Sequence, residues 1–198
     1  MNITRREAIK SMAILMGASV VGPRLLAGTF GLQTPLDFSD ADIALLDEIG
    51  ETIIPTTNIP GAKATNIGAF IAMMVADCYT PAAQKAFREG LAKLPADYEA
   101  RYGEKFIGGK AENRTQFLNA LDTEQRKYTS ANKRKIDDFA NGVSTVDVPP
   151  HYFRVMRELT ILGYFSSEIG STKAVKYLEV PGRYDGNVPY KKGDEWFI

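Results

Sequence analysis

The chain has 198 residues, of which 44% are hydrophobic and 24% are charged, and its formal net charge is zero. This length suits one well-buried domain and is short for two, and the composition is typical of a soluble globular protein. The charge balance lacks the strong basic excess of a nucleic-acid-binding protein, so no nucleic-acid partner is expected.

The N-terminal segment has the order of a twin-arginine export leader. The pair Arg5-Arg6 precedes a short, weakly apolar run over residues 11–21, and Ala27 offers a cleavage point. The run is shorter than the ~20 apolar residues that a membrane span needs. We therefore predict a signal peptide over residues 1–27, export of the folded protein to the periplasm by the twin-arginine translocase, and a linker over residues 28–37.

Two alternatives to a cleaved leader stay open. The arginine pair can be a chance pair at the start of an amphipathic helix, or the leader can be retained and hold the protein at the membrane. Removal of residues 1–27 would leave 20 basic and 23 acidic residues, a net charge of −3.

The first helix of the domain is predicted to begin at Ser39 or Asp40, which are good N-cap residues, and to end at Pro55. Residues 56–62 form a turn-rich loop. The 3.6-residue period predicts a buried face made of these residues: Ile43, Leu46, Ile49 or Gly50, and Ile53.

A second helix is predicted over residues 66–79, and Thr80-Pro81 starts a third that reaches Leu94-Pro95 and can extend to Tyr102. The single cysteine, Cys78, lies in the apolar second helix, so a buried, inert thiol is expected. The alternative is a disulfide to a partner subunit, because an exported cysteine meets an oxidising compartment.

Residues 103–110 are predicted to be irregular, and a short helix through Phe117 and Leu121 follows. Residues 122–125 resemble a capping box that opens another helix, which Asn141-Gly142 closes. The basic residues of that helix are expected to form a solvated face, with a docking surface as the alternative. Its inward positions would be Tyr128, Asn132, Ile136 and Phe139.

The last predicted helix covers residues 152–168. Arg154 and Glu158 are spaced as an ion pair in its first half, but no charged residue occurs between Leu159 and Phe165. A helix that is apolar on all sides is either the central core helix or is partly covered by another protein. With an extended C-terminal tail beyond Gly170, the sequence predicts a mainly α domain over residues 38–198.

The sequence lacks the common signatures of redox and hydrolytic sites. It has no G-x-G-x-x-G turn for a dinucleotide, and one cysteine cannot supply a C-x-x-C-H haem motif. His151 and Cys78 are too few for a zinc or copper site, and His151 is expected to be a capping or surface residue. We therefore expect no catalytic, cofactor-binding or metal-binding residues in this chain.

Three motifs, together with the leader, resemble the gluconate 2-dehydrogenase subunit 3 family over residues 38–190. The segment 102–148 carries none of them, and its role stays open. The motifs are Glu51-Thr52-Ile53-Ile54-Pro55 with Pro60-Gly61-Ala62, Gly163-Tyr164-Phe165-Ser166-Ser167-Glu168-Ile169-Gly170, and Val180-Pro181-Gly182-Arg183-Tyr184-Asp185-Gly186.

The resemblance implies a small helical subunit bound to a large FAD-dependent dehydrogenase of the glucose-methanol-choline type. Such complexes oxidise sugars, sugar acids or polyols in the periplasm and pass electrons to a cytochrome c subunit that carries haem c. The large subunit typically lacks an export signal, which the small subunit supplies. A different reading of the chain is a stand-alone exported enzyme or ligand-binding protein with an unrecognised site.

Aromatic residues of the last helix and the tail are candidates for contacts with the partner, because aromatic side chains dominate buried interfaces. Tyr164 and Phe165 can equally pack in the core. In the same region Gly163 is expected to allow a close approach by another chain segment, and Gly170 to end the helix with a positive φ. The interface candidates are Tyr164, Phe165, Tyr184, Trp196 and Phe197.

Overall fold

The computed structural model describes residues 38–143, 145–175 and 189. The chain divides into two units, Met1–Asp37 and Phe38–Ile198, and the described residues belong to the second. The predicted signal peptide and linker, and the interface candidates Tyr184, Trp196 and Phe197, lie outside the described residues.

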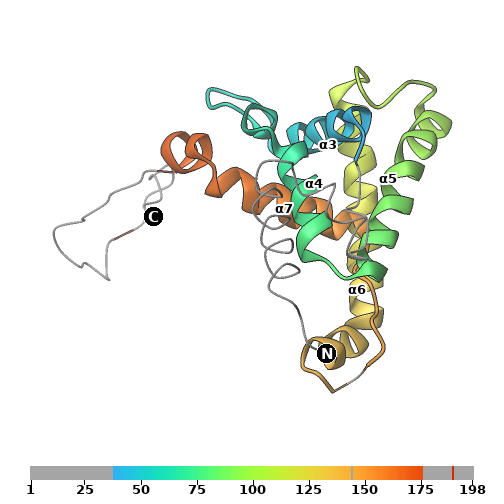
Figure 1. The fold of residues 1–198 in the computed structure, drawn as a ribbon. Coiled ribbons are helices and arrows are strands. Elements are labelled where there is room, and N and C mark those ends of the chain that lie inside the picture. The colour runs from blue at the N-terminus through green and yellow to red at the C-terminus, as the bar shows by residue number, and fades with distance from the viewer. Residues whose placement is uncertain (1–37, 144, 176–188, 190–198) are drawn as a thin grey trace, which may run out of the picture. The chain divides into compact units, whose positions relative to one another are not determined.

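The described part of the chain contains helices and no strand, which confirms the prediction of a mainly α fold (Figure 1). A 3₁₀ turn, η1, precedes the second helix, and a π turn, η2, follows the last. The elements are α3 (Asp40–Ile53), η1 (Ala62–Thr65), α4 (Ile67–Cys78), α5 (Pro81–Tyr102), α6 (Ala111–Ala140), α7 (Tyr152–Ser166) and η2 (Gly170–Ala174). None of these helices combines the length and the apolar character that a membrane crossing requires.

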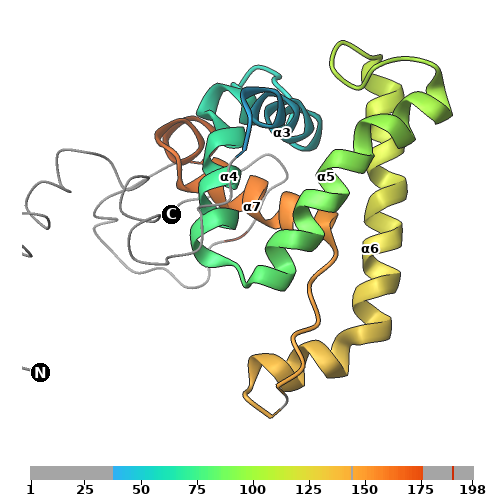
Figure 2. The ribbon, with the colours of Figure 1, turned by 45° about the vertical axis from the view of Figure 1, so that its right-hand side comes forward.

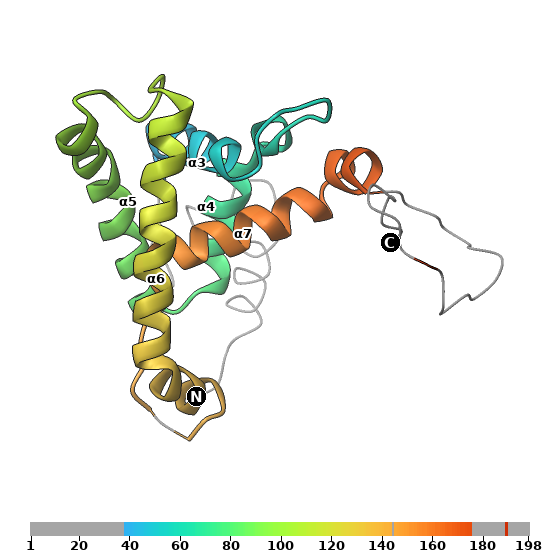
Figure 3. The ribbon, with the colours of Figure 1, turned by 180° about the vertical axis from the view of Figure 1, so that it is seen from behind.

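Helix α7 is the centre of the packing. It contacts α3, α4, α5 and α6, and Figures 1 and 3 show it crossing the other helices. The core around it is made of aliphatic and aromatic side chains that are almost completely buried. The largest of them are Leu46, Ile49, Ile67, Ile71, Val75, Phe87, Leu91, Leu94, Tyr98, Phe106, Val155 and Met156.

The first three helices begin and end close to the predicted positions. Ser39 caps α3, and its hydroxyl accepts a hydrogen bond from the Asp42 N–H at 3.2 Å. Thr80 caps α5 in the same way, with Pro81 at the first helical position. Helix α5 continues through Pro95 to Tyr102, where Gly103 (φ 69°) ends it.

Helices α5 and α6 are joined by the loop 103–110 at one end of the domain (Figure 2). Phe106 from this loop and Phe117 from α6 pack edge-on against Tyr98, with ring centroids 5.0 and 5.4 Å away. The Tyr98 hydroxyl donates to Glu104 at 2.8 Å. Burial and this hydrogen bond raise the pKa of Tyr98 to about 12. The aromatic cluster therefore holds the last turn of α5, beyond Pro95, against α6.

The prediction of two helices between residues 111 and 141 is wrong, because α6 is one continuous helix of 30 residues. No Gly or Pro interrupts it around Asp122. The Asp122 carboxylate does not cap a new helix; it accepts from Arg126 at 2.7 Å and from Arg157 of α7 at 2.6 Å. Asn141-Gly142 closes α6 as predicted, with Gly142 at φ 70°.

Two further expectations are wrong. Cys78 is exposed, because it is the last residue of α4 and the buried face of that helix ends before it. Gly170 does not have a positive φ and does not begin an extended segment; residues 170–174 form the π turn η2. At Gly170 a Cβ would lie 1.8 Å from the carbonyl oxygen of Tyr164, so the glycine is needed there for space.

Candidate functional site

The loop after α3 is built around the Glu51 carboxylate. This carboxylate accepts the backbone N–H groups of Thr56 at 2.8 Å and Lys63 at 3.0 Å. Gly61 runs so close to it that a Cβ there would lie 2.5 Å from Glu51 Oε2. The first motif therefore has a structural role: Gly61, which has no side chain, lets the loop after α3 fold closely over the Glu51 carboxylate.

Tyr164 links this loop to α7. Its hydroxyl donates to the Pro60 carbonyl at 2.8 Å, and only 3% of the residue is exposed. Burial, with a smaller contribution from Glu51, raises the pKa of Tyr164. Of the two roles open for Tyr164, the described chain places it in the core, which leaves almost none of its surface for a partner.

Gly163 makes the close approach that was predicted for it. A Cβ at Gly163 would lie 2.5 Å from Phe70 Cδ1 and 2.6 Å from Ile67 Cδ1, both on α4. The missing side chain lets α4 and α7 pack directly against each other. The first and second motifs thus meet at one end of α7, while the third, residues 180–186, lies outside the described residues.

The outer side of α7 changes character along its length. In the first half Arg154 donates to Glu158 at 2.8 Å, as the sequence predicted. In the second half Ile161, Leu162 and Phe165 are 44%, 52% and 41% exposed. We call these three residues the α7 patch. The inner side of α7 therefore belongs to the core, as one of the two expectations has it, and within the described residues the outer side of its second half is apolar and exposed.

A group of charged residues ties α3 to η1 and α6. Glu48 accepts from Lys63 at 2.7 Å and forms an ion pair with Arg114. Burial alone would raise the pKa of Glu48, but the hydrogen bonds from Lys63 and Arg114 outweigh it and lower the pKa. An ionised carboxylate bound by two cations from different elements acts as a structural clamp between α3, η1 and α6.

His151 is a capping residue, as predicted. Its Nδ1 accepts the Phe153 N–H at 3.2 Å at the start of α7, and its Nε2 lies 3.6 Å from Glu124. Burial lowers the pKa of His151, against the opposing effect of Glu124. Its acceptor atom is occupied by the helix terminus, so the imidazole serves the fold of α7.

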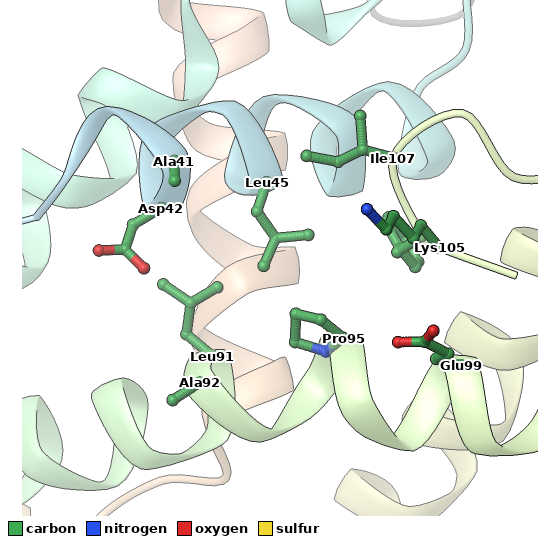
Figure 4. Close-up of a pocket in the computed structure, with 10 residues that line it drawn as sticks. Ala41, Asp42, Leu45, Leu91, Ala92, Pro95, Glu99, Lys105 and Ile107 are labelled. Atoms are coloured by element: carbon green, nitrogen blue, oxygen red, sulfur yellow. The ribbon is translucent and has the colours of Figure 1, made fainter.

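A groove of about 400 Å³ lies between α3 and α5. Figure 4 shows Leu45 and Leu91 pointing toward each other across it, with Asp42 at one end and Glu99 at the other. Asp42 is already engaged by Arg88 at 3.3 Å. The residues that line the groove are Ala41, Asp42, Leu45, Leu91, Ala92, Pro95, Glu99, Lys105, Phe106 and Ile107. Within the described residues, no three His, Cys, Asp or Glu side chains are grouped so that they could hold a metal ion.

The sequence was compared with known families, curated proteins and solved structures. The family model for gluconate 2-dehydrogenase subunit 3 matches residues 40–182. The comparisons with curated proteins and with solved structures gave no match. The matched region contains every described helix and two of the three motifs entirely, and it covers well over half of the chain. The chain therefore belongs to the gluconate 2-dehydrogenase subunit 3 family.

Proposed function

We propose that this chain is the non-catalytic small subunit of a periplasmic FAD-dependent dehydrogenase that oxidises a sugar, a sugar acid or a polyol. The family match over residues 40–182 is the observation that carries the proposal, because the family is named as a subunit of a dehydrogenase. In this assignment the large subunit binds FAD and substrate, and a cytochrome c subunit with haem c accepts the electrons. This chain contributes no group to the redox chemistry.

The small subunit would do two things for its partner. The pair Arg5-Arg6 would direct the folded complex to the twin-arginine translocase, so that a large subunit without a leader is carried across the membrane with its flavin already bound. The helical domain would stabilise the large subunit by binding only its folded form, which shifts the folding equilibrium by mass action. Membrane association would follow from the complex or from a retained leader.

The export role can be tested by co-expression with a large flavoprotein subunit encoded beside this chain. The double substitution Arg5→Lys plus Arg6→Lys should abolish periplasmic flavin and dye-linked sugar dehydrogenase activity while both subunits accumulate in the cytoplasm. Arg24→Lys, which changes an arginine of the leader outside the pair, is the matched control and should leave export unchanged. Normal export of the partner by the double variant would contradict the escort role.

The stabilising role needs a separate measurement. In the cytoplasm, the large subunit should be less abundant and unfold at a lower temperature when this chain is omitted. Equal abundance and equal thermal stability with and without the small subunit would refute the stabilising role and leave the export role standing.

One observation favours the alternative of a stand-alone ligand-binding protein. The groove between α3 and α5 has about 400 Å³, a size that can hold a small ligand, and its walls are mainly apolar with a few polar groups. Mass spectrometry of the purified lone chain under native conditions distinguishes the two functions. A retained small molecule, or turnover by the lone chain, would favour the alternative.

A further inference from the structure

A second pocket, of about 250 Å³, lies where α3, α6 and α7 meet. Each of these helices packs against the other two, and Figure 3 shows α6 crossing α7. The volume corresponds to roughly eight water molecules at about 30 Å³ each, which suits a molecule of the size of a monosaccharide. The apolar residues that line the pocket are Ile53, Leu118 and Phe153, and the polar ones are Thr52, Thr115, Asn119, Asp122 and Arg157.

Arg157 is a charged group of this pocket that keeps free hydrogen-bonding capacity. Its Nη1 donates to Asp122 at 2.6 Å, and its side chain is 30% exposed. Its Nε is buried without a partner, and its Nη2 makes no hydrogen bond within the described residues. A guanidinium has five N–H donors, so the protein uses only part of this one. The terminal Nη2 group can therefore donate to a ligand in the pocket.

The Asp122 carboxylate does not cancel the positive charge at the pocket. It accepts from Arg126 at 2.7 Å as well as from Arg157, so one carboxylate serves two guanidinium groups. Burial alone would raise the pKa of Asp122, but the hydrogen bonds from Arg126 and Gln125 and the charge of Arg157 outweigh it and lower the pKa. Asp122 is therefore ionised, and these three charged residues leave one positive charge in excess. That excess favours an anionic ligand.

Uncharged polar side chains supply further hydrogen-bonding groups. Thr115 and Asn119 are four residues apart on α6, so they lie on the same side of the helix. Within the described part of the chain, neither side chain makes a hydrogen bond. The Thr52 hydroxyl on α3 donates to the Glu48 carbonyl at 2.8 Å and can still accept. Hydroxyl and amide groups of this kind exchange hydrogen bonds with the hydroxyl groups of a ligand.

We infer that the pocket between α3, α6 and α7 binds a small hydroxylated carboxylate, which is a property beyond the accessory function and independent of it. The Nη2 group of Arg157 donates to the carboxylate of the ligand. Thr115 and Asn119 exchange hydrogen bonds with its hydroxyl groups, and the apolar residues of the pocket contact its C–H groups. Asp122 is a positioning residue that holds Arg157 in place.

The test uses the full chain and D-gluconate as the probe, since gluconate carries one carboxylate and a chain of hydroxyl groups. Isothermal titration calorimetry should give a Kd on the order of 1 mM, as expected for a small ligand in an open pocket. Sorbitol has the same chain length and a hydroxyl group in place of the carboxylate. It should bind at least about tenfold more weakly, because the charge-assisted hydrogen bond from the guanidinium is lost.

Three variants test the assigned contacts. Arg157→Lys keeps the positive charge but lacks the planar fork, and it should weaken gluconate binding about tenfold. Thr115→Ala plus Asn119→Ala removes two uncharged groups from an exposed helix surface, where alanine supports the helix, and should weaken binding about fivefold. The matched control is Arg154→Lys, an arginine of the same helix that pairs with Glu158 outside this pocket; it should change the affinity less than about twofold.

NMR chemical-shift mapping locates the bound probe. Gluconate should shift the signals of Thr115, Leu118 and Asn119 and leave that of Ile107 unchanged. No binding with gluconate in large excess over the expected Kd, or equal affinity for sorbitol and gluconate, overturns the proposal. Shifts centred on the groove between α3 and α5 or on the α7 patch also refute it.

Competition with sodium sulfate distinguishes a built site from a charged surface. If sulfate displaces gluconate at equal concentration and the Thr115→Ala plus Asn119→Ala variant binds like the wild type, the pocket holds an adventitious ion only and the proposal is wrong. All of these measurements use this chain without the large subunit, so a negative result leaves the accessory function standing.

Discussion

Gly163→Ala offers a sharp test of how α4 and α7 pack. In an exposed helix this substitution would stabilise the protein by about 1 kcal/mol, because alanine is the better helix former. At Gly163 the new Cβ would meet Phe70 Cδ1 at 2.5 Å and Ile67 Cδ1 at 2.6 Å. Both distances are shorter than an ordinary carbon contact by about 1 Å.

The steric cost decides the sign of the effect. Ile67 is 1% exposed and enclosed by the core, whereas Phe70 is half-buried and can yield more easily. Overpacking of a filled core costs about 1–3 kcal/mol. After subtraction of the helix-propensity gain, Gly163→Ala should lower the free energy of unfolding by up to about 2 kcal/mol, and the melting temperature by up to about 8 °C for a domain of this size.

Urea unfolding of the purified chain, followed by circular dichroism, measures this difference. A double-mutant cycle with Ile67→Val supplies the control, because valine lacks the Cδ1 atom that the new methyl group would meet. The two substitutions should be coupled by at least about 0.5 kcal/mol, with the double variant more stable than the sum predicts. A Gly163→Ala variant that is more stable than the wild type would refute the close packing of the two helices.

The remaining predictions concern the loop, a helix cap and the aromatic cluster. Glu51→Gln should lower the free energy of unfolding by about 1–2 kcal/mol, because an amide oxygen replaces a carboxylate that accepts two backbone N–H groups. The control is Glu89→Gln on the exposed side of α5. It should change the free energy of unfolding by less than about 0.5 kcal/mol in the same urea titration. Burial lowers the pKa of His151 in the folded protein. The stability that this shift contributes is present above the ordinary pKa of about 6.5 and is lost as the pH falls through the folded value. H151N keeps a capping side chain and should make the melting temperature less dependent on pH between pH 7 and 5. The pKa of Tyr98 is raised to about 12, so its neutral hydroxyl stabilises the fold below about pH 10, and this effect is lost as the pH rises toward 12. Tyr98→Phe removes the bond to Glu104 and should make the melting temperature less dependent on pH between 10 and 12. An unchanged pH dependence in that range would speak against this assignment.

The sequence by itself predicted the helices with clear caps and periodicity. Ser39 and the Thr80-Pro81 pair set the starts of α3 and α5 through local hydrogen bonding and a fixed φ, and such signals need no distant partner. Capping by His151 and the close approach at Gly163 followed from position and residue type in the same way. The sequence also predicted the family, which the match over residues 40–182 confirms.

Tertiary contacts decided what local patterns could not. The group Asp122-Thr123-Glu124-Gln125 has the composition of a helix start, but Arg157 of α7 binds the Asp122 carboxylate and α6 continues. Tyr164 could have faced a partner or the core, and the carbonyl of Pro60, more than a hundred residues earlier in the chain, fixed it in the core. The exposure of Leu162 beside buried Gly163 likewise depends on where α4 lies. Caps and turns form between residues that are close in the sequence, so the sequence alone can predict them. Burial depends on which distant elements cover a helix, and this is decided only when the whole domain packs.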